Sequence, residues 1–139
     1  MKSTQSSLVG PYLVDLPKIL DERGNLTFIQ NRDHFPFDIA RTFFIYDVPG
    51  DGTRGGHAYH QQWEVIVALS GSFTVRTITG GEVAEFHLRR PYQGVVLPPL
   101  VWRSMVDFST NSVSLHLADR PYDAADYIVD YEVYKNKIA

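Results

Sequence analysis

Turn-forming residues recur along this chain roughly every 8–12 positions and divide it into short segments of alternating apolar and polar residues. Gly71, Gly80-Gly81 and Pro98-Pro99 mark such turns. Because successive side chains of a strand point to opposite faces, the alternation predicts strands that are buried on one face. The predicted strands cover residues 26–30, 42–47, 62–69, 73–77, 83–88, 95–97, 101–108 and 112–118. Short strands at this spacing are typical of an all-β sandwich or barrel.

The C-terminal tail changes from the period of a strand to that of a helix. Tyr127, Tyr131, Tyr134 and Ile138 follow one another at three- and four-residue spacing, and Asp123 is a candidate N-cap. The sequence therefore predicts a jelly-roll barrel closed by one C-terminal helix. The tyrosines of that helix either cover their own barrel or form a surface on which a second copy packs.

Length and composition limit the function classes. The 139 residues suit a single domain, which we expect to span 1–139. The absence of cysteine excludes a disulfide scaffold, a thiolate zinc site and a cysteine nucleophile. A net charge of -3 lacks the basic footprint of a nucleic-acid-binding protein. No apolar run has the length of a signal peptide or a membrane span, so we expect a soluble, cytoplasmic protein without a membrane partner.

The segment Arg-Gly-Gly-His-Ala-Tyr-His at 54–60, followed by Glu64 and Gly71, is the most informative stretch. It resembles the first cupin motif, in which a glycine-rich loop enters a strand that carries His-x-His, then a Glu, then a hairpin Gly. His57 occupies the first histidine position, and Tyr59 stands where the motif has its second histidine.

Residues 98–107 resemble the second cupin motif, with Arg103 in place of its ligand histidine and Asp107 in place of its asparagine. A guanidinium is protonated at physiological pH and has no lone pair to offer a cation. The sequence therefore predicts a cupin without a metal.

The alternation of side chains along a strand predicts which face each of these residues points to. If one strand runs unbroken through this region, His57 and Tyr59 share the interior face with the apolar residues of 63–67, and Glu64 points away unless a bulge turns it inward. A lone interior histidine is about as often a hydrogen-bonded core residue as a catalytic one. The company of Tyr59, Arg54 and Arg103 favours an active site.

Two further arginines are candidates for binding phosphate oxygens. Arg23 lies in a polar loop, and Arg41 begins an apolar segment. A planar guanidinium binds phosphate through paired hydrogen bonds, although a surface salt bridge is the alternative interpretation for each. We assign no role to six further residues whose neighbours suggest none: Arg89, Arg90, Arg120, His34, His87 and His116.

The chain resembles the cupin-fold TDP-4-keto-6-deoxyglucose 3,4-ketoisomerases over nearly its whole length. The matching segments are residues 21–26, 54–59, 69–73, 101–109 and 126–131. The related 3,5-epimerases share the Asp-x-Arg-Gly and Arg-Gly-x-His pieces, whereas the segments at 101–109 and 126–131 resemble the ketoisomerases. The match therefore favours the ketoisomerases.

This resemblance implies a homodimer that needs no metal and no cofactor, and that moves the carbonyl of a TDP-linked 4-keto-6-deoxyhexose from C4 to C3 before amination at C3. The reaction removes a proton alpha to a ketone, so it needs a base, a donor to the enediolate oxygen and anchors for the diphosphate. The candidates are His57 as base, Tyr59 or Arg103 as donor, Arg23, Arg41 and Arg54 as anchors, and Tyr46 or Phe44 to stack on thymine.

Several alternatives stay open. With one imidazole, either His57 serves both carbons or Tyr59 acts as its partner. A non-catalytic nucleotide-sugar-binding cupin and a 3,5-epimerase of the same substrate are alternative functions, whereas Arg103 disfavours a metal-dependent dioxygenase. The product can belong to the galacto or the gluco series.

Overall fold

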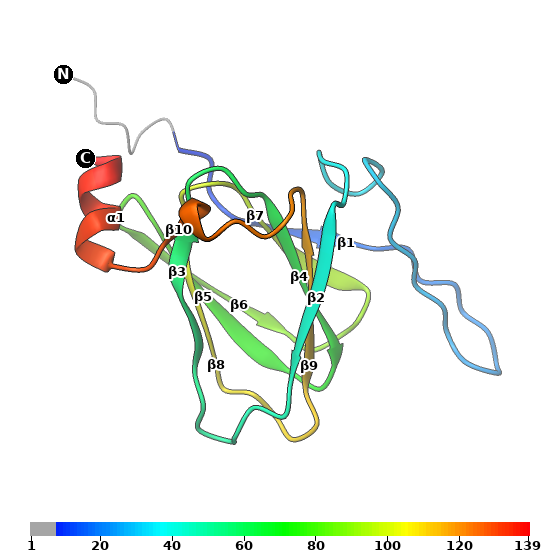
Figure 1. The fold of residues 1–139 in the computed structure, drawn as a ribbon. Coiled ribbons are helices and arrows are strands. Elements are labelled where there is room, and N and C mark those ends of the chain that lie inside the picture. The colour runs from blue at the N-terminus through cyan, green and yellow to red at the C-terminus, as the bar shows by residue number, and fades with distance from the viewer. Residues whose placement is uncertain (1–7) are drawn as a thin grey trace.

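The computed structural model describes residues 8–139, which form two five-stranded antiparallel sheets facing each other (Figure 1). The first sheet has the order β1-β7-β4-β9-β2 and the second the order β10-β3-β8-β5-β6. Their strands are β1 (Tyr12–Asp15), β2 (Arg41–Tyr46), β3 (Arg54–Tyr59), β4 (Glu64–Ser70), β5 (Phe73–Thr79), β6 (Glu82–Leu88), β7 (Gln93–Leu97), β8 (Trp102–Val106), β9 (Val113–Ala118) and β10 (Tyr127–Ile128). This arrangement confirms the all-β jelly-roll barrel.

Most predicted strands are present, with two corrections. Residues 26–30 form no strand, because only an isolated bridge joins Ile19 to Leu26. The strand expected at 62–69 begins only at Glu64, whereas β3 ends at Tyr59. The turn between them connects the second sheet to the first. The unbroken pleat assumed from the sequence is therefore wrong.

The C-terminal helix is present but starts later than expected. Asp123 caps a single 3-10 turn at Ala124–Asp126, and β10 follows, paired with β3. The helix α1 spans Tyr131–Ile138, and its cap is Asp130, which accepts a hydrogen bond from the backbone N–H of Glu132.

Tyr134 of α1 is fully buried, and its hydroxyl lies 2.8 Å from the carbonyl oxygen of Leu100 and 2.9 Å from that of Ile78. A buried tyrosine hydroxyl needs such partners. Tyr134 therefore covers its own barrel, as the first of the two alternatives for the tail expects.

The two faces of β4 enter two different cores. Ile66 and Ala68 point into the barrel, where they join Val75 and Leu97 in the inner core. Val65 and Val67 lie on the opposite face of β4. They belong to a second cluster, here called the outer core, together with Leu16, Phe35, Phe37 and Leu117. Val65 and Val67 are thus buried outside the barrel rather than inside it, which corrects the sequence interpretation.

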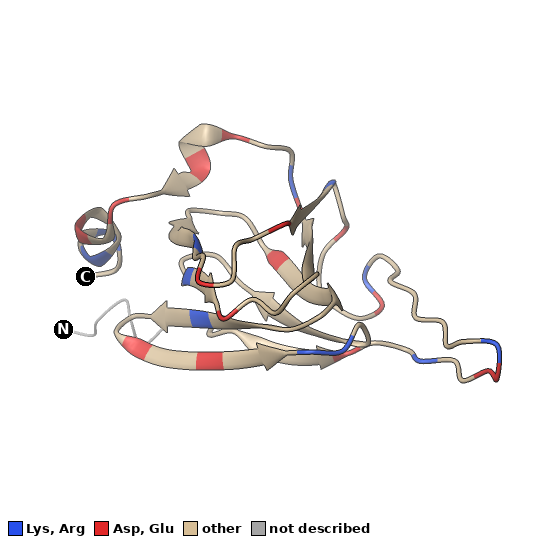
Figure 2. Cartoon of the chain, turned by 90° about the horizontal axis from the view of Figure 1, so that it is seen from below, with Lys and Arg blue, Asp and Glu red and all other residues tan. Residues whose placement is uncertain are grey.

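Residues 17–40, here called the arm, extend away from the barrel, and charged residues lie at its tip (Figure 2). The returning part of the arm is anchored by Phe35 and Phe37 in the outer core. Ile19 and Leu20 before the tip, and Leu26 just after it, are each more than half exposed. Among residues 8–139, no helix is long and apolar enough to cross a membrane.

Candidate active site

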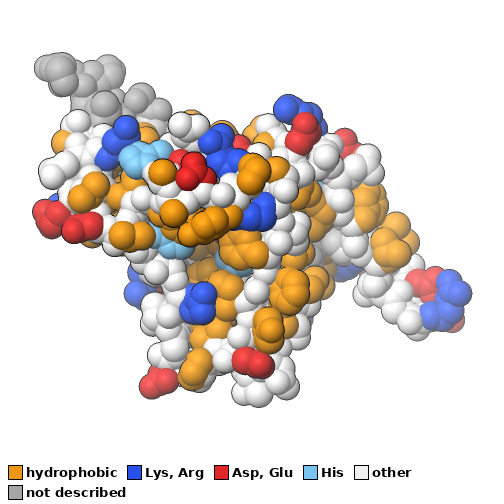
Figure 3. All heavy atoms as spheres, in the orientation of Figure 1, with side chains coloured by type: hydrophobic (Ala, Val, Ile, Leu, Met, Phe, Trp, Pro, Cys, Tyr) orange, Lys and Arg blue, Asp and Glu red, His pale blue; other side chains and the backbone are white. Residues whose placement is uncertain are grey.

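A cavity of about 180 Å³ lies inside the barrel, with walls from both sheets. Its polar lining residues are Arg54, His57, Tyr59, Glu64, Arg103, His116 and Tyr127. On the face that Figure 3 presents, apolar side chains gather between the sheets and histidine side chains show among them. The cavity brings together predicted site residues from segments far apart in the sequence.

A β-bulge aligns β3 with β8. Arg54 pairs with Met105 and Gly55 with Ser104, but after the bulge His57 stands opposite Arg103. Gly55 has a φ of +95°, and a Cβ there would lie 3.0 Å from the carbonyl oxygen of Arg103, so this position needs glycine. The glycine pair of the motif thus places an imidazole beside a guanidinium.

His57 is half-buried, and its ring contacts those of Tyr59 and Tyr127, with centroids 5.0 and 5.1 Å away. Burial and then the charge of Arg103 lower the pKa of His57 to about 4. The ring is therefore neutral at pH 7 and has a free electron pair for a proton. Its pKa lies below the near-neutral value that the reference imidazole suggested.

Tyr59 is only 1% exposed, and its ring lies 4.8 Å from the guanidinium carbon of Arg103. Burial raises the pKa of its hydroxyl, so Tyr59 stays protonated. Tyr127 covers it, with ring centroids 4.6 Å apart. Sequence reasoning missed Tyr127 as a lining residue, because its helical spacing concealed the two-residue strand β10.

Arg103 is almost completely buried, at 2% exposed. Its Nε donates to the carbonyl oxygen of Val101 at 3.1 Å, and its Nη1 donates to Glu64 Oε1 at 3.3 Å. Its Nη2 is buried and has no hydrogen-bond partner among the described residues. A buried donor without a partner costs free energy, so a ligand oxygen at this atom would be favoured.

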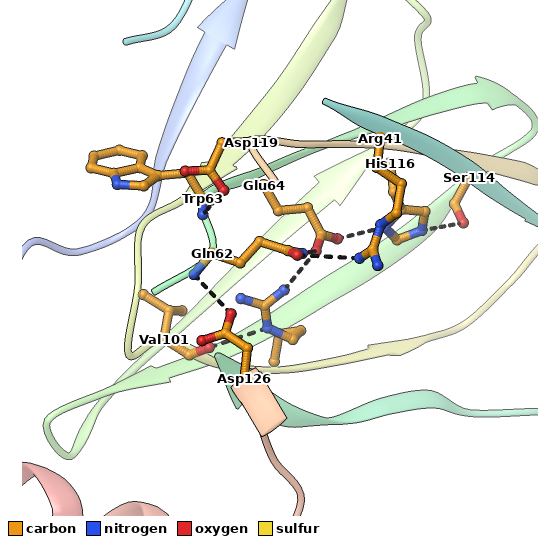
Figure 4. A network of polar contacts seen from close by, with 10 residues as sticks. Arg41, Gln62, Trp63, Glu64, Val101, Ser114, His116, Asp119 and Asp126 are labelled. Atoms are coloured by element: carbon orange, nitrogen blue, oxygen red, sulfur yellow. Dashed lines mark hydrogen bonds and ion pairs between the residues drawn. The ribbon is translucent and has the colours of Figure 1, made fainter. Parts of the chain in front are cut away.

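Glu64 points into the cavity, contrary to the expectation from parity, because β3 and β4 are separate strands. Figure 4 shows its carboxylate at the centre of a polar network. Its Oε2 lies 2.6 Å from His116 Nδ1, and Gln62 Nε2 donates to its Oε1 at 3.0 Å. Burial raises the pKa of Glu64, but the His116 hydrogen bond and the charge of Arg103 outweigh it and lower the pKa to about 2. Glu64 is therefore ionised.

His116, to which the sequence analysis assigned no role, is part of this network. Its Nε2 lies 2.9 Å from Ser114 Oγ, and its ring stacks on Phe43 with centroids 4.5 Å apart. The sequence placed His116 in a predicted strand but did not indicate that its face of β9 lines the cavity.

Arg54 lines the cavity, and Arg41 lies beside it. A hollow of about 300 Å³, lined by Arg41, Tyr122, Phe43 and Tyr127, shares the last two residues with the cavity. Arg41 Nη2 donates to Gln62 Oε1 at 3.2 Å, and its buried Nε has no partner among the described residues. Both arginines therefore lie where they could contact a ligand that extends from the cavity into the adjoining hollow.

Two predicted binding residues lie elsewhere. The side chain of Arg23 is 90% exposed at the tip of the arm, where it pairs with Asp21 at 2.7 Å. Tyr46 lies on the exposed face of β2 beside Phe44 and lines a separate surface hollow. Residues alternate along β2, so Phe43 faces the cavity and Tyr46 faces away from it.

Residues 8–139 contain no group of three or more His, Cys, Asp or Glu side chains arranged to hold a metal ion. Glu64 and His116 hydrogen-bond to each other, and Arg103 supplies a cation beside them. The donor set of this cavity suits an anionic or carbonyl oxygen rather than a metal.

Comparisons with known proteins show which family the chain resembles in sequence and fold. A relative from Aneurinibacillus thermoaerophilus, TDP-4-oxo-6-deoxy-alpha-D-glucose-3,4-oxoisomerase, is 38% identical over 127 residues, which are 91% of each chain. The 3,4-ketoisomerase QdtA from Thermoanaerobacterium thermosaccharolyticum, solved in complex with TDP, is 37% identical with a TM-score of 0.91 over 94% of this chain and 96% of its own.

A mutant of that ketoisomerase in complex with TDP-4-keto-6-deoxyglucose is 36% identical, with a TM-score of 0.91 over 94% of this chain and 95% of its own. The TDP-quinovose 3,4-ketoisomerase WlaRB from Campylobacter jejuni is 32% identical, with a TM-score of 0.88 over 93% and 99%. The family model described as "FdtA: WxcM-like, C-terminal" matches residues 10–139. The chain therefore belongs to the FdtA family of WxcM-like proteins.

Proposed function

We propose that this protein is a sugar 3,4-ketoisomerase that converts TDP-4-keto-6-deoxyglucose to its 3-keto isomer. Its relatives of 30% identity and more include ketoisomerases named for TDP-linked sugars, whereas a structure of a 4-keto-6-deoxy sugar epimerase is only 18% identical. The observation that carries the proposal is the pair formed by His57 and Arg103: a neutral imidazole stands opposite a buried guanidinium with an unused donor.

His57 acts as the base on carbon. The C3–H bond breaks, its electron pair forms the C3=C4 double bond, negative charge moves to the C4 oxygen, and the proton goes to His57. The electron pair of the C3=C4 bond then takes the proton from His57 at C4. The electrons of the O3–H bond form the new carbonyl at C3, and the O3 proton moves to the C4 oxygen. No electron enters or leaves, so the step needs no redox cofactor.

Arg103 stabilises the charge that forms on the sugar oxygen. Its unpartnered Nη2 is the better-placed donor of the two that the sequence suggested, because Tyr59 is almost fully buried beneath Tyr127. Tyr59 instead holds the guanidinium from one side. A fixed donor aimed at developing charge typically contributes about 10²- to 10³-fold in kcat.

Repulsion from Arg103 adds to burial, which is the larger cause, in lowering the pKa of His57 to about 4 in the empty cavity. An enediolate oxygen between the two cations offsets that repulsion only while the proton is on His57. The charge arrangement is therefore complementary to the intermediate rather than to the ketone.

Arg41 and Arg54 are the proposed diphosphate anchors. A sugar in the cavity can extend its diphosphate into the adjoining hollow, since the two spaces share Phe43 and Tyr127. The unpartnered Nε of Arg41 supplies a donor there.

We also propose that the protein is a homodimer in which the arm of one copy lies on the other. The arm carries apolar side chains along its length and charges at its tip (Figure 3). Exposed apolar residues of this kind mark interaction surfaces. Arg23 lies outside its own cavity, so it contributes to substrate binding only in the partner's site.

The test of the activity is incubation of the protein with TDP-4-keto-6-deoxyglucose in D₂O, with the sugar ring followed by NMR. The expected result is loss of the C3 proton signal and appearance of a 3-keto product. An unchanged spectrum with TDP-sugar bound would instead indicate a binding protein, and deuterium at C5 without a 3-keto product would indicate an epimerase.

Complementation tests the dimer. Arg23→Ala and His57→Asn variants are each inactive or impaired alone, but a mixed dimer has one site with both His57 and Arg23. Mixing the two after mild unfolding should therefore restore activity above either variant. No gain on mixing would contradict the shared site, and sedimentation at the mass of one chain would contradict the dimer.

A further inference from the structure

Glu64 is a buried carboxylate for which the proposed reaction has no direct use. It is 2% exposed and accepts hydrogen bonds from three side chains that come from different parts of the barrel. Arg103 and Gln62 share its Oε1, and His116 takes its Oε2 (Figure 4). Its lone pairs are thus occupied by the protein, which leaves little for a substrate.

Stability alone does not explain this arrangement. Taking a carboxylate and a guanidinium out of water costs several kcal/mol for each ion, by the order of magnitude known for buried charges, and an apolar pair of similar volume is often as stable. The contact between Arg103 and Glu64 fixes one end of the guanidinium, while the carbonyl of Val101 fixes Nε. What remains is an oriented cation with one spare donor, Nη2.

We infer that Glu64 is a positioning residue, which acts through Arg103. It holds the guanidinium so that Nη2 is left for the substrate oxygen, and its negative charge balances that of Arg103 beside His57. This inference rests on the proposed ketoisomerase function and adds to it the residue that prepares the donor.

His116 supports Glu64 rather than reacting itself. Both of its ring nitrogens are engaged, Nδ1 by Glu64 and Nε2 by Ser114. Phe43 holds the ring by stacking. With neither nitrogen free, His116 is not a second base, and it keeps the carboxylate in one orientation.

The charge balance at His57 reflects the groups around it. Arg103 lowers the pKa of His57, and Glu64 raises it. The titratable and charged groups that share the cavity are Arg54 and Tyr59 on β3, Glu64 on β4, Arg103 on β8, His116 on β9 and Tyr127 on β10, with Arg41 of β2 in the adjoining hollow. Removal of the Glu64 charge leaves His57 facing uncompensated cations, so its pKa falls further.

The first test compares Glu64→Gln in the parent protein and in an Arg103→Gln background. Glutamine keeps the size and hydrogen-bonding capacity of Glu64 but not its charge. We expect kcat to fall about 10- to 100-fold in the parent, as small misplacements of catalytic groups do, with KM within about 3-fold. In the Arg103→Gln background, the further loss should be under about 3-fold, because the two residues act as a unit.

The matched control is Glu85→Gln, which breaks an exposed pair with Arg76 of 2.8 Å on the same barrel. Its kcat should be unchanged. Equal losses from Glu64→Gln in both backgrounds, or full kcat for the single variant, would overturn the inference.

The second test needs no turnover. The His57 ring is titrated by NMR in the parent, in Glu64→Gln and in Arg103→Gln, and its pKa should fall in the first variant and rise in the second. A His57 titration that Glu64→Gln leaves unchanged would contradict the charge balance. If the parent itself fails to isomerise the sugar, the proposed function is wrong, and this titration still decides the role of Glu64.

Should Glu64→Gln fail to fold, Glu64→Asp replaces it. The shorter side chain keeps the charge but withdraws it from Arg103, so the His57 pKa should stay near the parent value while kcat falls. Full kcat for a folded Glu64→Asp protein would overturn the positioning role.

Discussion

The two walls of the cavity differ in how completely their polar groups are satisfied. The wall from β4 and β9 holds Glu64 and His116, whose charged and ring atoms are all hydrogen-bonded within the protein. The wall from β3 and β8 holds His57 and Arg103, where a neutral imidazole and the Nη2 donor have capacity to spare. We therefore propose that the substrate binds to the groups of the second wall, and that the first wall holds those groups in position.

The largest expected effect comes from removing the base of the second wall. His57→Asn should lower kcat by more than about 10³-fold, because no other histidine of residues 8–139 lines this wall with a free nitrogen, while TDP affinity stays within about 3-fold. Single-turnover kinetics and calorimetry measure the two quantities. The control is His87→Asn, an exposed histidine 2.8 Å from Thr74 Oγ1, which should keep full activity. Half the parent rate in His57→Asn would show that the base lies elsewhere.

The next effect is the loss of the free donor. Arg103→Gln should lower kcat about 10²- to 10³-fold per folded molecule, since the enediolate oxygen loses its charged partner. Arg76→Gln, in an exposed pair of the same sheet, is the matched control. Steady-state kinetics at saturating substrate provide the measurement, and a kcat within 3-fold of the parent would remove Arg103 from the reaction.

A smaller effect separates the inner and outer faces of β2. Arg41→Ala should raise KM about 10-fold with little change in kcat, as expected for one charged hydrogen bond to phosphate. Tyr46→Ala, on the outer face, should leave both constants unchanged. A raised KM for Tyr46→Ala alone would restore the thymine-stacking role that its position argues against.

The smallest effect is on acid stability, where the two walls titrate in different windows. His57 has a folded pKa of about 4 against 6.5 unfolded, so the unfolded state binds the extra proton and stability falls as the pH drops from 6.5 towards 4. Glu64 has a folded pKa of about 2 against 4.5, so the stability from its pairing is lost between 4.5 and 2. The free energy of unfolding, measured in urea, should therefore change less with pH in His57→Asn than in the parent between pH 6.5 and 4.5. The same pH dependence in both proteins would contradict the burial of a neutral imidazole.

The fold was largely predictable because short alternating strands and frequent turns leave few architectures. The second wall was predictable too, since the motif around His57 and the replacement at Arg103 carry their chemistry in their residue types. Glu64 faces the cavity, against the prediction from strand parity, because a turn between Tyr59 and Glu64 carries the chain to the other sheet. Pleat parity holds only within one strand.

The remaining site residues depend on long-range pairing that a single sequence does not display. His116 enters the cavity through the register of β9 against β4, and Tyr127 through a two-residue strand added to β3. Arg23 matched a family segment, but only the fold shows that its loop is an exposed turn closed by the bridge from Ile19 to Leu26.

A crystal structure of His57→Asn with TDP-4-keto-6-deoxyglucose tests the contrast between the walls most directly. We expect a sugar oxygen within about 3 Å of Arg103 Nη2, a normal hydrogen-bond distance, with Glu64 and His116 still hydrogen-bonded to each other. A sugar hydrogen-bonded to Glu64 or His116, with Nη2 left unpartnered, would contradict it.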